Sequence, residues 1–152
     1  MSTTRRPELF FDSSALVAGV ISAKGAARAL LLLAEGGRIA LIVSEQVIAE
    51  TERALARKAP HALPYYREAL RSTNLRVIRD PRAEDVAAHH DICSHQADVP
   101  IVVAAMQAEV DVLVTLSRRH FIDGPTVAAC SGLRIAPPGD ALGWVRECVS
   151  ER

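Results

Sequence analysis

The stretch LFFDSSALVA, residues 9–18, decides the fold, because it joins an apolar strand to an apolar helix through one aspartate. Residues 9–11 predict a buried strand, and residues 13–22 predict a helix. Asp12 stands between the two, where a carboxylate serves either as a helix cap or as a metal ligand. Ser13 and Ser14 can cap this helix equally well, so the sequence favours the second role for the acid.

Short apolar segments alternate with helical patterns along the rest of the chain. Further strands are expected at residues 39–43, 75–78, 112–115 and 133–136. Further helices are expected at residues 25–34, 45–59, 61–71, 83–93, 100–109 and 139–149. Strands separated by helices predict an α/β fold, a three-layer α/β/α sandwich with a central parallel sheet of four to five strands. Residues 1–152 are predicted to form a single domain.

The composition narrows the class of protein. Of the 152 residues 49% are hydrophobic, which excludes a disordered chain, and 18 basic residues balance 18 acidic ones. A nucleic-acid partner would therefore need a local cluster of positive charge. Three cysteines, an odd number without a C-x-x-C motif, indicate free thiols in a reducing compartment.

The chain shows no sign of a membrane or export segment. The longest apolar run after the first strand and helix, residues 29–34, is far shorter than the roughly 20 residues that cross a bilayer. The first residues carry two arginines but no secretory cleavage pattern follows them. We expect a soluble, cytoplasmic protein with no membrane partner.

Three acidic residues are candidates for a shared site. Ligands of parallel sheets bind beyond the carboxyl ends of the strands, which places Asp12 at the same edge as residues 115–117. Glu50 lies beside the apolar stripe of its helix, where most glutamates are merely solvated. Asp98 precedes Val99-Pro100, and such an aspartate is also a good helix start. Acids that cluster without a cation repel one another, so a shared hard cation such as Mg²⁺ is the natural reason to gather them.

Four segments, taken in order, resemble the PIN domain family. They are FFDSSALVAGVIS (10–22), SEQVIAETERAL (44–55), ADVPIVVAAMQAEVDVLVTLSRRHF (97–121) and GLRIAPPGDAL (132–142). PIN domains are the metal-dependent ribonuclease fold used by many bacterial toxins of toxin-antitoxin pairs. The resemblance covers nearly the whole chain, and it implies the same fold that the alternation of strands and helices predicts.

The resemblance also assigns roles to single residues. Asp12 matches the family's first metal-binding acid, Glu50 the second and Asp98 the third, so these three are the expected catalytic and metal-binding residues. Glu45 is a weaker match for the second acid and better placed to complement the helix dipole. Two hydroxyl residues are expected to support the site, namely Ser13 beside the first acid and Thr115 at the end of the fourth strand.

The chain departs from the family pattern at one position. Many relatives carry a fourth acid two residues after the threonine, where this chain has Ser117. A serine can hold a water by hydrogen bonding but adds no charge, so metal binding should be weaker, particularly for a second ion. Asp111 precedes its strand and should lie at the opposite edge of the sheet. Asp123 is better placed, but Asp-Gly is also a plain turn.

Basic residues beside the expected site offer contacts for RNA. Arg118 and Arg119 follow the fourth strand, and Arg53 lies on the helix of Glu50, so these three are expected to bind phosphates that flank the scissile bond. His120 is either a general acid or a spacer before Phe121.

The leading expectation is a Mg²⁺- or Mn²⁺-dependent endoribonuclease, the toxin of a toxin-antitoxin pair, with a cognate antitoxin protein and a homodimeric state as further partners. A second hypothesis is a PIN-fold module that binds RNA or protein without cutting, which Ser117 favours. A third is a haloacid-dehalogenase-like phosphatase with Asp12 as nucleophile. That chemistry calls for a second aspartate two residues on, where Ser14 stands.

Overall fold

A central sheet of parallel strands organises the molecule. The computed structural model describes residues 5–117, 121 and 125–150. In it the strands are β1 (Glu8–Phe11), β2 (Ala40–Ser44), β3 (Arg76–Ile78), β4 (Val112–Val114) and β5 (Ile135–Ala136). Their order in the sheet is β3-β2-β1-β4-β5, and every pairing is parallel. The predicted parallel sheet is therefore confirmed.

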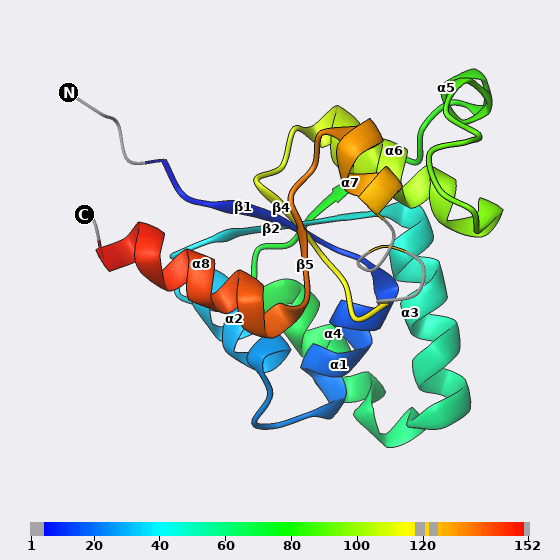
Figure 1. The fold of residues 1–152 in the computed structure, drawn as a ribbon. Helices are drawn as coiled ribbons and strands as arrows, with labels where there is room; N and C mark the ends of the chain where they lie inside the picture. The colour runs from blue at the N-terminus through cyan, green and yellow to red at the C-terminus, as the bar shows by residue number, and fades with distance from the viewer. Residues whose placement is uncertain (1–4, 118–120, 122–124, 151–152) are drawn as a thin grey trace.

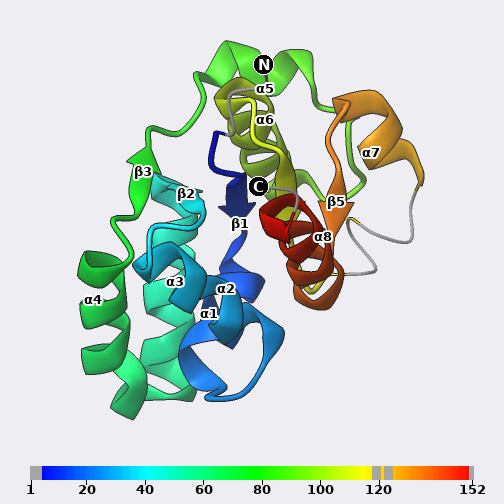
Figure 2. The same ribbon diagram turned by 90° about the vertical axis from the view of Figure 1, so that its left-hand side faces the viewer.

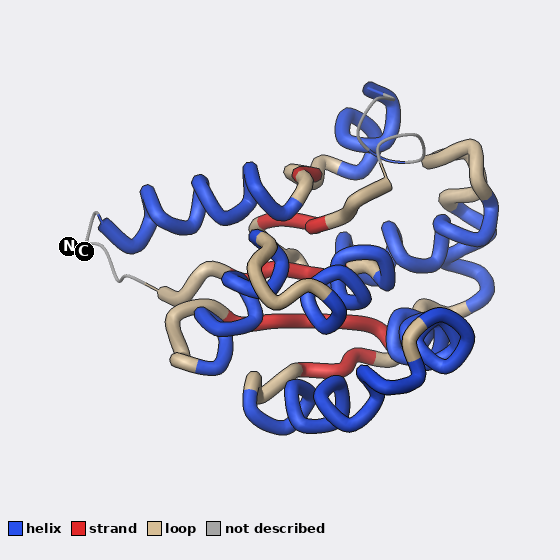
Figure 3. The backbone as a smooth tube through the Cα atoms, turned by 90° about the horizontal axis from the view of Figure 1, so that it is seen from below, coloured by secondary structure: helices blue, strands red, loops and turns tan. Residues whose placement is uncertain are grey.

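Helices cover both faces of this sheet, which confirms the predicted three-layer sandwich. The longer helices are α1 (Ser13–Ile21), α2 (Ala26–Glu35), α3 (Glu45–Lys58), α4 (Leu63–Ser72), α6 (Val99–Ala108) and α8 (Pro138–Ser150). Shorter elements are α5 (Ala83–Ala88), α7 (Pro125–Ser131) and the 3₁₀ turns η1 (Pro60–Ala62) and η2 (Gln96–Asp98). Figure 1 shows α1, α2, α4 and α8 on one side of the sheet and α6 and α7 on the other. Figure 3, seen from below, shows the strands lying side by side.

The central strands β1 and β4 are buried on both faces, which explains their unbroken apolar sequences. All side chains of β4 are fully buried, as are Leu9, Phe10 and Phe11 of β1. Helix α6 is buried almost all round, from Ile101 to Ala105, as its sequence predicts. The core thus holds β1 and β4 in place, and with them the backbone from which the side chains at their carboxyl ends project.

One predicted helix is shorter than expected, and one helix was not predicted. The helix expected at residues 83–93 ends at Ala88, and no residue of α5 is buried, so little packing holds it. The ring nitrogen Nδ1 of His89 lies 2.8 Å from the carbonyl oxygen of Asp85, the acceptor that the next helical amide would use. Helix α7 was not predicted, because its seven residues carry too short an apolar pattern to stand out.

The order of the strands reverses between β1 and β4. From β1 the chain continues on one side to β2 and β3 and later returns to the other side as β4 and β5 (Figure 2). Phe11 pairs with Val114, and the amide of Asp12 donates to the carbonyl of Val114 at 3.1 Å. Such a reversal of strand order is where parallel sheets bind ligands.

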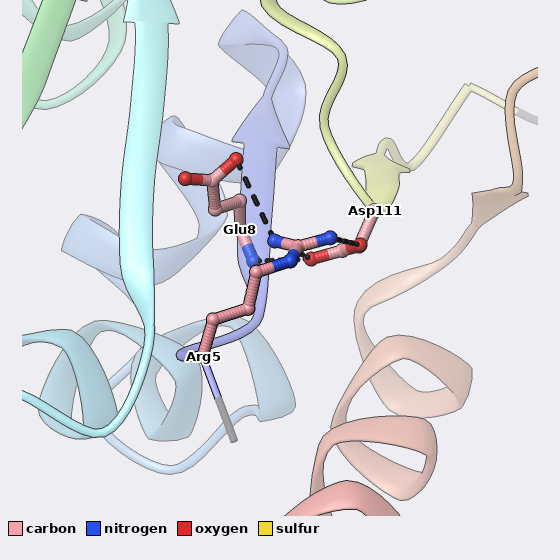
Figure 4. A network of polar contacts seen from close by, with 3 residues as sticks. All are labelled: Arg5, Glu8 and Asp111. Carbon is pink, nitrogen blue, oxygen red and sulfur yellow. Dashed lines mark hydrogen bonds and ion pairs between the residues drawn. The ribbon is translucent and has the colours of Figure 1, made fainter. Parts of the chain in front are cut away.

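Asp111 lies at the opposite edge of the sheet, as strand direction predicts. Its Oδ1 accepts a hydrogen bond from Nη2 of Arg5 at 2.8 Å, and its Oδ2 accepts from the amide of Glu8 at 2.7 Å (Figure 4). Glu8 begins β1, whereas Asp12 follows the end of this strand. Asp111 therefore ties the amino ends of β1 and β4 together and takes no part in the site described next.

Within residues 5–117 and 125–150, no single helix is long and apolar enough to cross a membrane. Only α1 and α2 taken as a pair reach that length and composition, and they are bent by 89° at their junction.

Candidate metal centre

Asp12 is nearly inaccessible to solvent and fully engaged in hydrogen bonds. It is 4% exposed, directly after β1. Its Oδ1 accepts from the amide of Ala15 at 2.9 Å and from Oγ of Ser14 at 2.7 Å, and its Oδ2 accepts from Oγ1 of Thr115. Asp12 is thus the N-cap of α1, the simpler of its two expected roles. The same geometry fixes a carboxylate where the strand order reverses between β1 and β4.

Burial raises the pKa of the Asp12 carboxyl above its ordinary value. Hydrogen bonds from Thr115, Ser14 and Ala15 oppose this shift, whereas the nearby charge of Asp98 adds to it. Asp12 and Asp98 therefore sense each other electrostatically although they lie far apart in the sequence. A pair of neighbouring carboxylates in a low-dielectric setting is a chemical environment that a bound cation would relieve.

A cluster of hydroxyl groups joins the ends of β1 and β4. Oγ of Ser14 accepts from the amide of Leu116 at 2.9 Å, and Oγ1 of Thr115 accepts from the amide of Ser117 at 2.9 Å. The expected support from Thr115 is therefore a direct contact with Asp12. Ser117 joins through its backbone amide, and its side chain is half-buried. Ser14 was not predicted as a site residue, because its sequence position suggested only a helix cap.

Both carboxylate oxygens of Glu50 are held by neutral donors. Oγ of Ser13 donates to Oε1 at 3.0 Å, and Nε2 of Gln46 donates to Oε2 at 2.9 Å. Ser13 thus contacts the second acid rather than the first, to which it is adjacent in sequence. Gln46 was not predicted from the sequence, although its position one helical turn before Glu50 was a usable signal.

Asp98 lies at the junction of η2 and α6. Pro100 stands in the first turn of α6, as the helix-start interpretation predicts, but the side chain of Asp98 does not cap the helix. Its Oδ2 atom is buried. The charge of Asp98 also helps to raise the pKa of the Cys93 thiol to about 11, after burial as the first cause. The charge of Asp98 therefore acts on both Asp12 and Cys93.

The three acids have the right chemistry for a hard cation, but their side chains are not arranged around one position. They offer only carboxylate oxygens, the type of ligand that Mg²⁺ and Mn²⁺ prefer. In the part of the chain that the structure describes, no three Asp, Glu, His or Cys side chains are arranged to hold an ion. Ser13 and Gln46 hold the carboxylate of Glu50 in one orientation.

The remaining predicted residues lie around this group. Arg53 is exposed on α3, one turn beyond Glu50. Oε1 of Glu45 accepts from the amide of Asp80 at 3.1 Å, and Glu45 stands in the first turn of α3, where an acid complements the helix dipole. The predictions for four residues fall outside the described part of the chain: Arg118, Arg119, His120 and Asp123.

Comparisons with known proteins agree with the fold and indicate the family. The sequence model of the PIN domain matches residues 8–119. The crystal structure of PAE2754 from Pyrobaculum aerophilum is similar over 95% of this chain and 99% of that chain, with a TM-score of 0.66 and 20% identity. VapBC2 from Rickettsia felis, bound to a DNA fragment from their promoter, is similar over 84% of this chain and 96% of that chain, with a TM-score of 0.60 and 16% identity. A search of the curated proteins gives no significant match.

Proposed function

The chain belongs to the PIN domain family, and on that premise we propose that it is a metal-dependent endoribonuclease, the toxin of a toxin-antitoxin pair. PIN domains are generally nucleases and usually use divalent metals. One observation carries the proposal for this chain. Asp12 is a buried carboxylate where the strand order reverses between β1 and β4, and its pKa is raised by burial first, with the charge of a second acid, Asp98, adding to the shift.

In this proposal Asp12, Glu50 and Asp98 hold Mg²⁺ or Mn²⁺. The cation, when bound, would activate a water and offset the charge that develops on phosphate oxygens during hydrolysis. The protein's own contribution is orientation. Thr115, Ser14 and the amide of Ala15 fix the two oxygens of Asp12. Such second-sphere hydrogen bonds keep ligands in their working geometry.

RNA would be held by positive charge near these acids. Arg53 is exposed on the helix that carries Glu50, and phosphate contacts of this kind position a substrate without reading its sequence. Arg118 and Arg119 are part of the same proposal through their sequence positions alone. Because the net charge of the chain is zero, this local group has to supply the attraction for RNA.

We extend the proposal to partners and location. The similarity to VapBC2 supports an antitoxin protein as a partner, and a homodimer is the corresponding oligomeric state to test. Cys93, Cys130 and Cys148 are free thiols, which favours action in a reducing cytoplasm.

A second candidate function is a module that binds RNA or protein without cutting. Ser117 stands where many relatives have a fourth acid, and this position offers an amide bonded to Thr115 rather than a charge. Calorimetric titration with Mn²⁺ separates the two candidates, because a module that only binds needs no cation.

The decisive experiment is RNA cleavage by the pure protein with Mn²⁺, with Mg²⁺ and with a chelator. We expect cleavage with either cation, none with the chelator, and a loss of at least about a hundredfold in Asp12→Asn, by the usual scale of losses at catalytic groups. Cleavage that survives both chelation and the substitution rules out the proposed mechanism. A folded protein that neither cleaves RNA nor binds Mn²⁺ favours the second candidate.

A further inference from the structure

Gln46 connects the two elements that carry the second and third acids. It lies on α3, one turn before Glu50. Its Nε2 atom donates to Oε2 of Glu50 at 2.9 Å and to the carbonyl oxygen of Ala97 at 3.0 Å. Ala97 belongs to η2 and directly precedes Asp98. One side-chain amide therefore bridges α3 to the segment that positions Asp98.

The contacts fix the orientation of this amide. Both partners of Nε2 are oxygen atoms that can only accept, a carboxylate and a backbone carbonyl. The amide group of glutamine has two N–H donors, and the bridge uses one for each acceptor. With the amide turned over, its oxygen would face two acceptors, so only the observed orientation is compatible with these neighbours.

The backbone around Gln46 is anchored as well. Its amide nitrogen donates to Oδ1 of Asp80 at 2.8 Å, and the amide of Asp80 donates back to Oε1 of Glu45. These two hydrogen bonds, one from Gln46 to Asp80 and one from Asp80 to Glu45, join the start of α3 to the loop after β3. The side chain of Gln46 thus projects from a fixed point, and it can hold Glu50 and the η2 segment in a constant relation.

We propose that Gln46 is a positioning residue for the proposed cation site, which ties Glu50 to the segment of Asp98 and preorganises both for a shared ion. The inference rests on the proposed function. Gln46 offers no charge and bonds to one acid and to the backbone beside another. Its loss should therefore act on cation affinity, with little effect on the chemical step.

The test compares Gln46→Met with the wild-type chain. Methionine keeps the length of the side chain and removes both N–H donors. Loss of such a second-sphere contact typically weakens metal affinity by about 10–100-fold, so we expect Mn²⁺ affinity measured by calorimetry to fall by about tenfold or more. In cleavage assays the half-saturating Mn²⁺ concentration should rise similarly, with the maximal rate within about threefold of wild type.

Gln107→Met is the matched control. Gln107 is exposed near the end of α6, and its amide donates to Asp85 rather than to any of the three acids. This variant should bind Mn²⁺ like the wild type. Thermal unfolding without Mn²⁺ shows whether each variant is folded, and Gln46→Ala replaces Gln46→Met if the longer side chain prevents folding.

The outcomes separate this inference from the proposed function. If the wild type and Gln107→Met bind Mn²⁺ and a folded Gln46 variant binds it equally well, the positioning role is wrong and the nuclease proposal stands. A Gln46 variant that unfolds more easily but keeps its Mn²⁺ affinity also overturns the positioning role, because Gln46 then serves stability alone. If the wild type binds no Mn²⁺, the proposed function fails and the inference fails with it.

Discussion

The surroundings of Asp12 act on its pKa in opposite directions. As the N-cap of α1 it accepts hydrogen bonds that favour the carboxylate, while burial and Asp98 favour the neutral acid and raise its pKa. The ionised form is therefore costly in the protein without a cation. A residue that destabilises the fold in this way is typical of sites kept for function.

Asp12→Asn should therefore stabilise the protein at pH 7 when no metal is present. Asparagine caps helices about as well as aspartate, and it cannot ionise. Because the pKa of Asp12 is raised in the folded protein, folding favours the neutral acid. The stability that comes from this neutral form is fully present below the ordinary carboxyl pKa, and it is lost as the pH rises through the folded pKa. We expect the melting temperature at pH 7 to rise by about 2–4 °C, the equivalent of roughly 1 kcal/mol.

The pH dependence checks the cause. The advantage of Asp12→Asn should shrink as the pH falls toward the ordinary carboxyl pKa, since wild-type Asp12 then becomes neutral too. Asp111→Asn is the control at the opposite edge, where the carboxylate is bonded to Arg5 and to the amide of Glu8. A lower melting temperature for Asp12→Asn at pH 7 would show that the charge of Asp12 stabilises the fold, contrary to this prediction.

Thr115→Val should destabilise the fold despite its nearly equal size. The hydroxyl donates to Asp12 and accepts from the amide of Ser117, so its removal leaves both groups without this partner. Loss of one partner of a buried hydrogen bond costs about 1–3 kcal/mol. We expect this loss in urea denaturation, together with weaker Mn²⁺ binding.

Thr73→Val provides the comparison for Thr115. Thr73 is also buried, but its hydroxyl donates to the carbonyl of Ala69, which already accepts from the amide of Thr73. Its removal leaves no acceptor unpaired, so its loss should be the smaller of the two. Equal losses would mean that the contact with Asp12 adds nothing to stability.

At the scale of helices, Arg28 joins α1 to α2 and α4. Its Nε donates to the carbonyl of Gly19 at 2.6 Å and its Nη2 to the carbonyl of Val20 at 2.7 Å, while its guanidinium lies 4.2 Å from the ring centre of Tyr65. The last carbonyls of a helix lack internal partners. The fork of the guanidinium satisfies two of them at once.

Arg28→Lys should therefore destabilise the protein although the charge is kept. Lysine lacks the planar fork and the stacking surface of arginine, and we expect a loss of about 1–2 kcal/mol in urea denaturation, on the scale of hydrogen bonds to charged groups. Mn²⁺ affinity should stay unchanged, because Arg28 contacts none of the three acids. A variant with wild-type stability would mean that water replaces the arginine at these carbonyls.

The elements themselves were largely predictable, for a physical reason. Buried strands such as β1 and β4 have unbroken apolar sequences, and α3 is marked by the cap Ser44 and by Pro60. The failures were α5 and α7, short helices with little or no buried surface, which leave almost no periodic signal. The opposite placement of Asp12 and Asp111 followed from strand direction alone.

At the scale of the molecule, the contacts within the site were not predictable. Gln46 meets Ala97 across 51 residues, and Ser14 meets Leu116 across 102. Such contacts depend on the strand order β3-β2-β1-β4-β5, which brings β4 beside β1. Local sequence patterns specify strands and helices, but they do not specify which loops face each other once the sheet has formed.

A shared cation would bind three separate parts of the sequence together, so it should stabilise the whole fold. A ligand that binds only the folded state at about a hundred times its Kd adds about 2.7 kcal/mol, which corresponds to roughly 5–10 °C in a domain of this size. We expect Mn²⁺ to raise the melting temperature by this amount and a chelator to reverse the effect. Asp12→Asn, Glu50→Gln and Asp98→Asn should each abolish most of the rise, because each acid supplies a ligand from a different element. If Mn²⁺ leaves the wild-type melting temperature unchanged, or if one of these acids proves dispensable for the rise, the three residues do not share an ion.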